Sequence, residues 1–168
     1  MRPGSFVEMV EANRHHPRPK ETDMRFLCIV KATPESEKGL VFDDRTKKMF
    51  EDMGKFNEEM ARAGVMLSGD GLKPSSEGAR VNFKGNQRTV TDGPFSETKE
   101  LIAGFWIIQA KSLEEAVEWM KRCPHPHPGH DTNIEIRPFY EMEDFGDVFS
   151  PEEREREERI RRDLEKKS

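Results

Sequence analysis

The sequence lacks any arrangement of cysteines that would cross-link the chain or hold a structural metal ion. Its two cysteines, Cys28 and Cys123, form no CxxC pair and have no zinc-ligand spacing. There is also no apolar run of the length needed to span a bilayer, and the first residues lack the apolar segment of a secretory signal. We therefore expect a cytoplasmic protein with reduced thiols and no membrane partner. Cys28 is predicted to be a core residue, whereas Cys123 is either structural or reactive.

Basic blocks, catalytic sets and cofactor motifs are missing as well. The 28 Lys and Arg residues are outnumbered by 33 Asp and Glu residues, which argues against nucleic acid as a partner. Gly69 and Gly71 are not followed by the GK[ST] of a phosphate-binding loop. No Ser-His-Asp or Cys-His set includes a residue placed to orient the histidine. The sequence therefore indicates no cofactor and identifies no nucleophile.

The two ends of the chain differ in composition from the middle. Residues 1–23 contain only scattered apolar side chains, and we predict a flexible N-terminal extension. Residues 141–168 are predicted to form an acidic linker and a charged helix that Ser150 caps. Fourteen of the last eighteen residues are charged, seven of each sign, so this helix is either solvated or an arm that docks onto a partner. The packed domain is expected at residues 24–140.

Two segments, residues 24–32 and 101–110, have apolar side chains on both faces, which is typical of central strands that are covered on both sides. Residues 65–72 predict another strand, and residues 134–138 predict an edge strand because they end in a proline. Residues 79–92 alternate on either side of Lys84-Gly85-Asn86 and predict a β-hairpin. In the first central strand Phe26, Cys28 and Val30 oppose Leu27 and Ile29, and in the second Phe105 and Ile107 oppose Trp106 and Ile108.

Two amphipathic helices are predicted between these strands. The first runs from about Asp43 to Ala63, with Gly64 as its C-terminal cap, and the second begins with a capping box at Ser112 to Glu115. The apolar stripe of the first helix either packs in the core or forms a cofactor groove. Asn57 beside that stripe and Ser68 in the glycine-containing strand are candidate ligand-binding residues. The stripe consists of Met49, Met53, Phe56 and Met60, and the second helix presents Leu113, Ala116, Val117, Met120 and Cys123.

The segment RTVTDGPFSETKE, residues 88–100, combines a polar strand, a turn and a group of charges. In its Asp-Gly-Pro sequence, Asp92 is suited to capping the turn, while the glycine and the proline force the chain out of the sheet. The charges beside Phe95 have two readings. They are turn caps and strand-end salt bridges, or they are a ligand site in which carboxylates and an ammonium shift each other's pKa. The candidate site residues are Asp92, Phe95, Glu97, Lys99 and Glu100.

The same segment carries a resemblance to a known family. TDGPFSETKE, the Gly-Phe-Trp that follows it, and SLEEAVEWMKRCP resemble the YCII-related family, in particular the branch with a DGPFAETKE motif, although Ser96 stands where alanine is usual. The resemblance covers Met24 to about Gly146. It implies an α+β, ferredoxin-like sheet of the dimeric α+β barrel type with an added hairpin and helices on one face. The order of the predicted strands and helices points to the same fold.

Apolar residues on both faces of the central strands indicate that something covers the side of the sheet away from the helices. A two-fold partner would do so, and we expect a homodimer. Members of the wider family use a histidine on the first helix and an aspartate near the end of the second. This sequence has no histidine on that helix, and Cys123 stands near the place of the aspartate, so the dyad is not carried over.

A second candidate site is the loop from Pro124 to Asp131, which contains three histidines among three prolines and a glycine. Its side chains are either weak metal ligands or parts of an exposed loop without a metal, and we expect no resident metal. Two functions remain open. The first is a small-molecule pocket beside the DGPF turn with acid–base chemistry, and the second is a non-catalytic module for protein interaction or regulation. The candidate metal ligands are His125, His127, His130 and Asp131.

Overall fold

The computed structural model describes residues 23–167. The predicted N-terminal extension therefore lies outside the described residues except for Asp23. The chain divides into two compact units, the first of which ends at Pro138. The elements of the first unit are β1 (Met24–Lys31), α1 (Asp44–Arg62), β2 (Met66–Gly71), β3 (Ala79–Lys84), β4 (Gln87–Asp92), β5 (Ile102–Ala110), α2 (Leu113–Lys121) and β6 (Ile134–Pro138), with short 3₁₀ turns η2 (Ser36–Lys38), η3 (Ser75–Glu77) and η4 (Thr98–Glu100).

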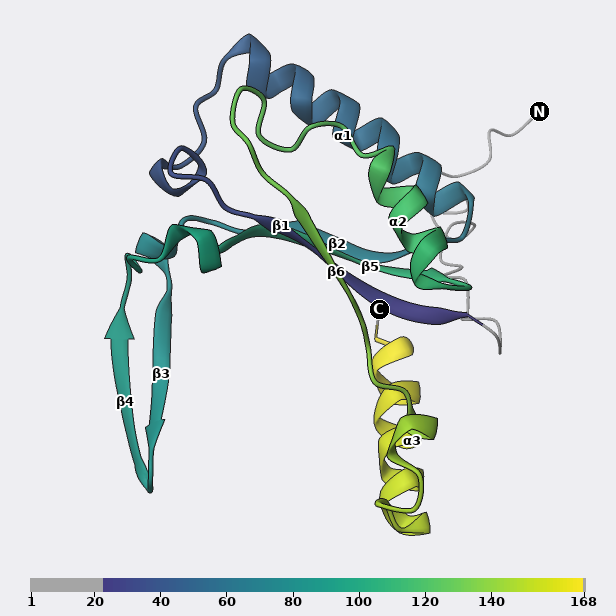
Figure 1. Ribbon diagram of the computed structural model, residues 1–168. Coiled ribbons are helices and arrows are strands. Elements are labelled where there is room, and N and C mark those ends of the chain that lie inside the picture. The colour runs from purple at the N-terminus through teal and green to yellow at the C-terminus, as the bar shows by residue number, and fades with distance from the viewer. Residues whose placement is uncertain (1–22, 168) are drawn as a thin grey trace, which may run out of the picture. The chain divides into compact units, whose positions relative to one another are not determined.

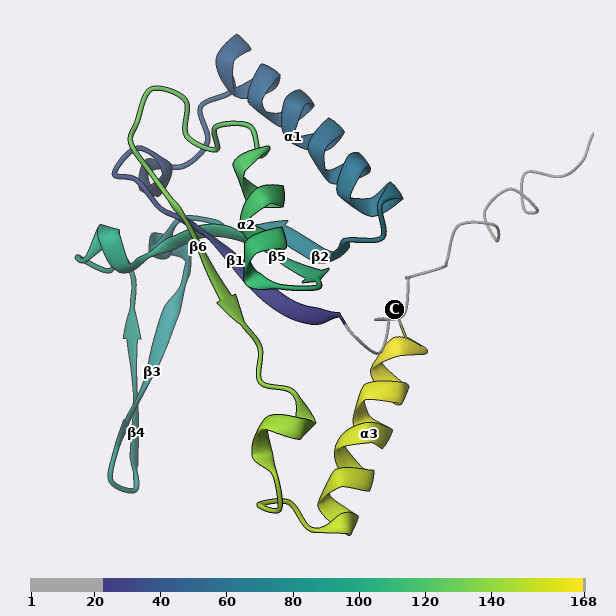
Figure 2. The same cartoon turned by 45° about the vertical axis from the view of Figure 1, so that its right-hand side comes forward.

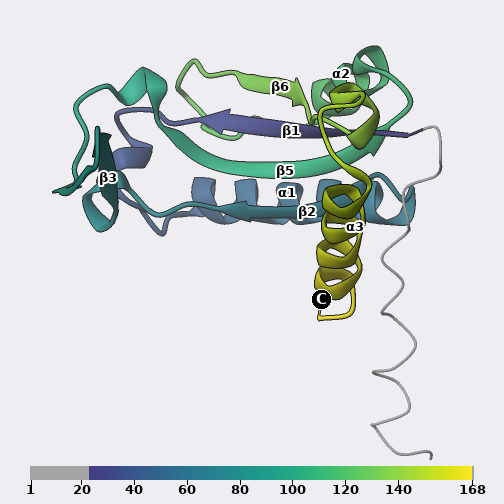
Figure 3. The same cartoon turned by 90° about the horizontal axis from the view of Figure 1, so that it is seen from below.

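Four strands of the first unit form one antiparallel sheet in the order β2-β5-β1-β6, which Figure 3 shows from below. The helices α1 and α2 connect β1 to β2 and β5 to β6, so the succession is that of a ferredoxin-like fold. The remaining strands, β3 and β4, pair only with each other in a separate hairpin. The predicted α+β fold, with two central strands, an edge strand and an added hairpin, is confirmed.

Both helices of this unit lie on one face of the sheet (Figures 1 and 2). Phe26 and Cys28 of β1 and Ile108 of β5 are fully buried beneath them. On the other face, Leu27 pairs with Ile107 across β1 and β5, and these side chains are only half-buried. The predicted alternation is therefore confirmed, and it leaves one apolar face under helices and one that the helices do not cover. The helical part of the core comprises Phe56, Met60, Ala116 and Met120, which fall on the predicted stripes.

The ends of the helices follow the capping chemistry that the sequence indicates, with one exception. The carboxylate of Asp43 accepts the Thr46 backbone N–H at 2.8 Å, and Gly64 has the positive φ of a helix-ending residue. At α2, the Ser112 hydroxyl accepts the Glu115 N–H at 3.2 Å. The Glu115 carboxylate, however, accepts the N–H of Lys111 rather than that of Ser112. The predicted capping box is therefore only half correct, because the carboxylate reaches one residue further back.

The second unit, Phe139–Ser168, contains η5 (Met142–Phe145) and α3 (Pro151–Glu165). At its start, the ring of Phe145 packs against Tyr140 and Phe149, with ring centroids 5.5 and 5.0 Å away. The predicted cap of α3 is present in full, since Ser150 and Glu153 each bond the other's backbone N–H. Among the helices of residues 23–167, none combines the length and the apolar character required to cross a membrane.

Candidate functional site

The DGPF turn lies at the base of the hairpin, and hydrogen bonds to other segments of the chain hold it in place. The N–H of Gly93 donates to the carbonyl oxygen of Gly78 at 2.9 Å, and the peptide bond before Pro94 is cis. The N–H of Phe95 donates to the Ser75 hydroxyl at 3.1 Å. A Cβ atom at position 93 would collide with the carbonyl oxygen of Ser75, so only glycine fits this close approach.

Ser75 is in turn held by Glu37, which the sequence did not single out. The Glu37 carboxylate accepts the Ser75 N–H at 3.1 Å and the Ser75 hydroxyl at 2.5 Å. Three chain segments are thereby joined in series, from η2 through η3 to the DGPF turn. Asp92, by contrast, is exposed, and its carboxylate has no hydrogen-bond partner among the described residues. The prediction that Asp92 caps the turn is wrong, because Ser75 supplies the acceptor that the turn needs.

Beyond the turn, Phe95 is half-buried, and the Arg80 guanidinium lies 3.8 Å from its ring centroid. This cation–π contact fixes the ring against the base of the hairpin. The residues after it, 96–99, turn towards the end of the sheet. There they form one wall of a cavity of about 500 Å³, which we call the Lys99 cavity.

The other walls of the Lys99 cavity are residues 32–34, which follow β1, and Asp131 of the histidine-rich loop. Glu97 and Lys99, both predicted site residues, therefore face the same space as Asp131, which was predicted only as a metal ligand. Asp92 and Glu100 are not among the residues that line it. The proposed charge cluster is thus divided, and half of it meets a carboxylate from a distant part of the chain.

Hydrogen bonds fix the walls of this cavity to one another. The Ala32 N–H donates to the Leu101 carbonyl at 3.0 Å, and the Lys31 N–H donates to the Asn133 carbonyl at 3.2 Å. The buried Thr33 accepts the Ser36 N–H with its hydroxyl oxygen at 3.1 Å, while its own N–H donates to the Ser36 hydroxyl at 2.9 Å. The cavity is therefore lined by tied backbone segments, which position its charged side chains.

The family to which this architecture belongs follows from comparison with known proteins. The model of the YCII-related domain matches residues 24–140, which is more than half of the chain. This chain belongs to the YCII-related domain family. A similar protein of Rhizobium meliloti (strain 1021), described as uncharacterised, is 27% identical over 95 residues, which are 56% of this chain and 76% of that protein.

Two further predicted ligand residues of this YCII-related domain lie away from the Lys99 cavity. Asn57 accepts the indole N–H of Trp106 at 2.9 Å, and the Trp106 ring makes an edge contact with Phe56. The amide of Asn57 thus satisfies a buried donor between α1 and the sheet. Ser68 is an exposed residue of β2 and pairs with Ile107 of β5. Neither residue lines the Lys99 cavity.

The histidine-rich loop is anchored by one of its three imidazoles. His127 Nε2 lies 3.0 Å from the Lys31 carbonyl oxygen, to which the Thr132 hydroxyl also donates at 3.2 Å. Burial lowers the pKa of His127, and the Lys31 carbonyl acts in the opposite direction. Within residues 23–167, no three His, Cys, Asp or Glu side chains gather in a way that would hold a metal ion. The loop histidines therefore act as separate groups in the described structure.

Cys123, the other residue with two readings, is enclosed by apolar surroundings. Its sulfur lies 3.2 Å from the carbonyl oxygen of Pro124 and 3.9 Å from the sulfur of Met53. Burial raises the pKa of the Cys123 thiol to about 12, and burial likewise raises that of Cys28 to about 12. Both groups are held as thiols near neutral pH, which favours the structural reading of Cys123 because the thiolate is the nucleophile.

Proposed function

We propose that this YCII-related domain binds a small polar molecule in the Lys99 cavity. The observation that carries the proposal is that the structure brings an ammonium and two carboxylates, Lys99, Glu97 and Asp131, around one space of about 500 Å³. That volume is in the range of pockets that hold small organic ligands. Charges of both signs suit a ligand with an anionic group and a hydrogen-bond donor.

The chemistry that such a site supports is proton transfer. A carboxylate within reach of a bound ligand accepts a proton, and a neighbouring ammonium stabilises the negative charge that develops on the ligand. In this proposal Lys99 binds the anionic group, and Glu97 or Asp131 is the base. The Glu37–Ser75 pair positions the wall, since it holds Phe95 and thereby the start of the segment that carries Glu97 and Lys99.

A thermal-shift screen of small organic acids, with and without site variants, tests this proposal. A ligand that binds only the folded protein raises its melting temperature, so hits on the wild-type protein are expected. Lys99→Gln and Glu97→Gln should remove those shifts. Glu100→Gln is the matched control, because Glu100 is an exposed residue of the same 3₁₀ turn that does not line the cavity. Hits that survive equally in all three variants would refute the assignment of this cavity.

We also propose that a second copy of the chain covers the face of the sheet opposite the helices. Leu27, Ile29, Phe105 and Ile107 form a continuous apolar patch there, because they pair across β1 and β5, and all four are half-buried. Such a patch is typical of an interface. Light scattering should give the mass of a dimer for the wild-type protein and a smaller mass for Ile107→Glu. The control variant is Leu113→Glu, which changes an exposed leucine of α2 and should remain dimeric. A monomer mass for the wild-type protein at micromolar concentration would contradict the proposal.

The alternative is a non-catalytic interaction module, and the hairpin is the observation that favours it. Val81, Phe83 and Val90 are exposed on β3 and β4 although all three are apolar. In that case the screen should give no ligand for the Lys99 cavity. The double variant Val81→Thr, Phe83→Thr should instead change the assembly mass in light scattering while leaving the melting temperature in place.

A further inference from the structure

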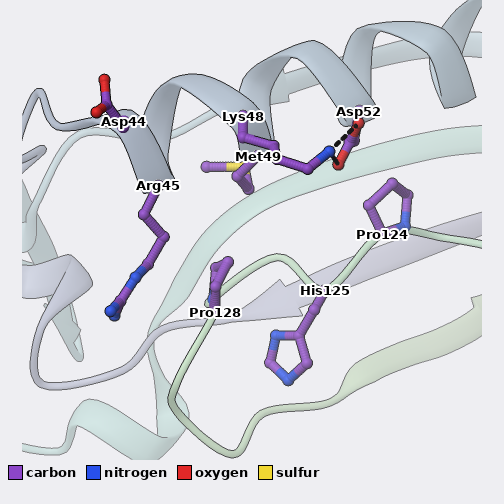
Figure 4. Close-up of a pocket in the computed structure, with 8 residues that line it drawn as sticks. All are labelled: Asp44, Arg45, Lys48, Met49, Asp52, Pro124, His125 and Pro128. Carbon is purple, nitrogen blue, oxygen red and sulfur yellow. Dashed lines mark hydrogen bonds and ion pairs between the residues drawn. The ribbon is translucent and has the colours of Figure 1, made fainter.

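A second cavity, of about 430 Å³, lies between the first two turns of α1 and the histidine-rich loop. Figure 4 shows Arg45 and His125 on either side of Pro128 in this view. We call this space the Arg45 cavity. None of its lining residues lines the Lys99 cavity, so the two spaces are separate.

The charged side chains of the Arg45 cavity differ in how far they are already paired. The Lys48 ammonium makes an ion pair with Asp52 at 2.8 Å, and the two are drawn joined in Figure 4. No carboxylate of residues 23–167 lies within ion-pair distance of the Arg45 guanidinium. That guanidinium extends towards the loop and lies beside Gly129. Its Nη1 is 3.4 Å from the place that the first side-chain atom of any other residue would occupy at position 129. The Arg45 guanidinium is a planar group with several N–H donors, and it lies at the edge of the Arg45 cavity.

His125 offers a second donor on the loop side. Its Nδ1 accepts the backbone N–H of His127 at 3.2 Å. In the neutral imidazole this places the ring proton on Nε2, which is then a donor. The two donors come from different elements, α1 and the loop, and both side chains line the same cavity.

Between these donors the lining is apolar. Met49, Pro124 and Pro128 supply carbon and sulfur surface, and all three are half-buried. Methionine adapts its shape to an apolar group more readily than a branched side chain does. The space is also much larger than a single inorganic ion requires.

The formal charges of the residues that line the Arg45 cavity favour an anion with a single charge over a polyanion. Arg45 and Lys48 are offset by Asp44 and Asp52, so the four formal charges sum to zero. A polyanion such as a phosphate ester would meet two carboxylates, whereas a single carboxylate is held by the unpaired guanidinium in a bidentate contact. From this geometry we infer that the Arg45 cavity binds a small organic monocarboxylate, with its carboxylate on Arg45 and its apolar body on Met49 and the two prolines.

Hexanoate is a suitable probe, and amide NMR of the ¹⁵N-labelled full-length chain is the measurement. Titration should give saturable shifts of the backbone amides of residues 45–49 and of His125, His127 and Gly129. Arg45→Gln should weaken hexanoate binding about tenfold or more, because it removes a charge-assisted bidentate contact. Lys47→Gln is the matched control, since it removes a neighbouring positive charge of α1 that does not line the cavity, and it should bind as the wild-type protein does.

Two further probes separate the carboxylate from the apolar body. Hexanamide has the same body without the charge, and inorganic phosphate has charge without the body, so both should bind at least about tenfold more weakly than hexanoate. The inference is overturned if hexanoate gives no saturable shifts, or if the shifts map to residues 96–99. It is also overturned if Arg45→Gln binds hexanoate as tightly as Lys47→Gln does.

Discussion

The four-stranded sheet and the β3–β4 hairpin are both antiparallel and both contain apolar side chains, yet different interactions stabilise them. In the sheet, Phe26 and Ile108 are fully buried. In the hairpin every residue of both strands is exposed, including Val81 at 56%, Phe83 at 71% and Val90 at 67%. The alternating pattern of residues 79–92 therefore predicts that these strands pair, but it does not predict that their apolar side chains are covered.

What holds the hairpin is its base. A two-stranded hairpin is at best marginally stable in water without packing on one face. Here the Gly93 N–H bonds the Gly78 carbonyl, and Ser75 links Glu37 to Phe95. Within the strands, the Asn82 amide donates to the Thr91 hydroxyl at 2.8 Å, which adds one cross-strand contact. The sheet is thus stabilised by buried area, and the hairpin by a few polar contacts.

The largest difference in the free energy of unfolding is expected when one phenylalanine is removed from each region. Phe26→Ala should lower the free energy of unfolding by about 3–5 kcal/mol, because it leaves a cavity under the helices. Phe83→Ala should change it by less than about 0.5 kcal/mol, because the ring is exposed and contacts mainly Arg88. Urea denaturation of both variants gives the two values. A large loss in Phe83→Ala would mean that the hairpin face is buried in solution, as it would be against a partner.

A smaller effect is expected at the base of the hairpin. Ser75→Ala should cost about 1–3 kcal/mol, because it removes an acceptor from the Phe95 N–H and a donor from Glu37. Asp92→Ala should leave the urea midpoint unchanged, since the carboxylate bonds nothing among the described residues. If Asp92→Ala were the more damaging variant, Asp92 rather than Ser75 would be the cap of the turn.

The smallest effect is the pH dependence contributed by His127. Burial holds the pKa of His127 in the folded protein below 6.5, so the unfolded chain takes up a proton first as the pH falls. This contribution to stability is therefore complete above about pH 6.5 and declines as the pH falls towards the folded-state pKa. The melting temperature should fall less between pH 7.5 and 5.5 in His127→Gln than in the wild-type protein. An equal fall in His127→Gln and in the wild-type protein would contradict this contribution of His127.

The features that could be predicted from the sequence are those with a local cause. The faces of β1 and β5, the start of α1 at Asp43 and the turn of the hairpin each depend on residues a few positions apart. The site depended on contacts between distant segments. Glu37 reaches Ser75 over 38 positions, and Asp131 joins Glu97 and Lys99 only when the sheet is assembled. Capping was one of two readings of Asp92 because an aspartate can bond the backbone of its own turn, while the actual acceptor, Ser75, lay in another segment.

The histidine-rich loop is a wall shared by the two cavities. Asp131 belongs to the Lys99 cavity, His125 and Pro128 belong to the Arg45 cavity, and His127 fastens the loop between them to the Lys31 carbonyl. If a ligand in one cavity displaces this loop, it changes the affinity of the other cavity, and thermodynamic linkage requires the factor to be the same in both directions. In that case, the His127 bond to the Lys31 carbonyl would contribute to the free energy needed to move the loop.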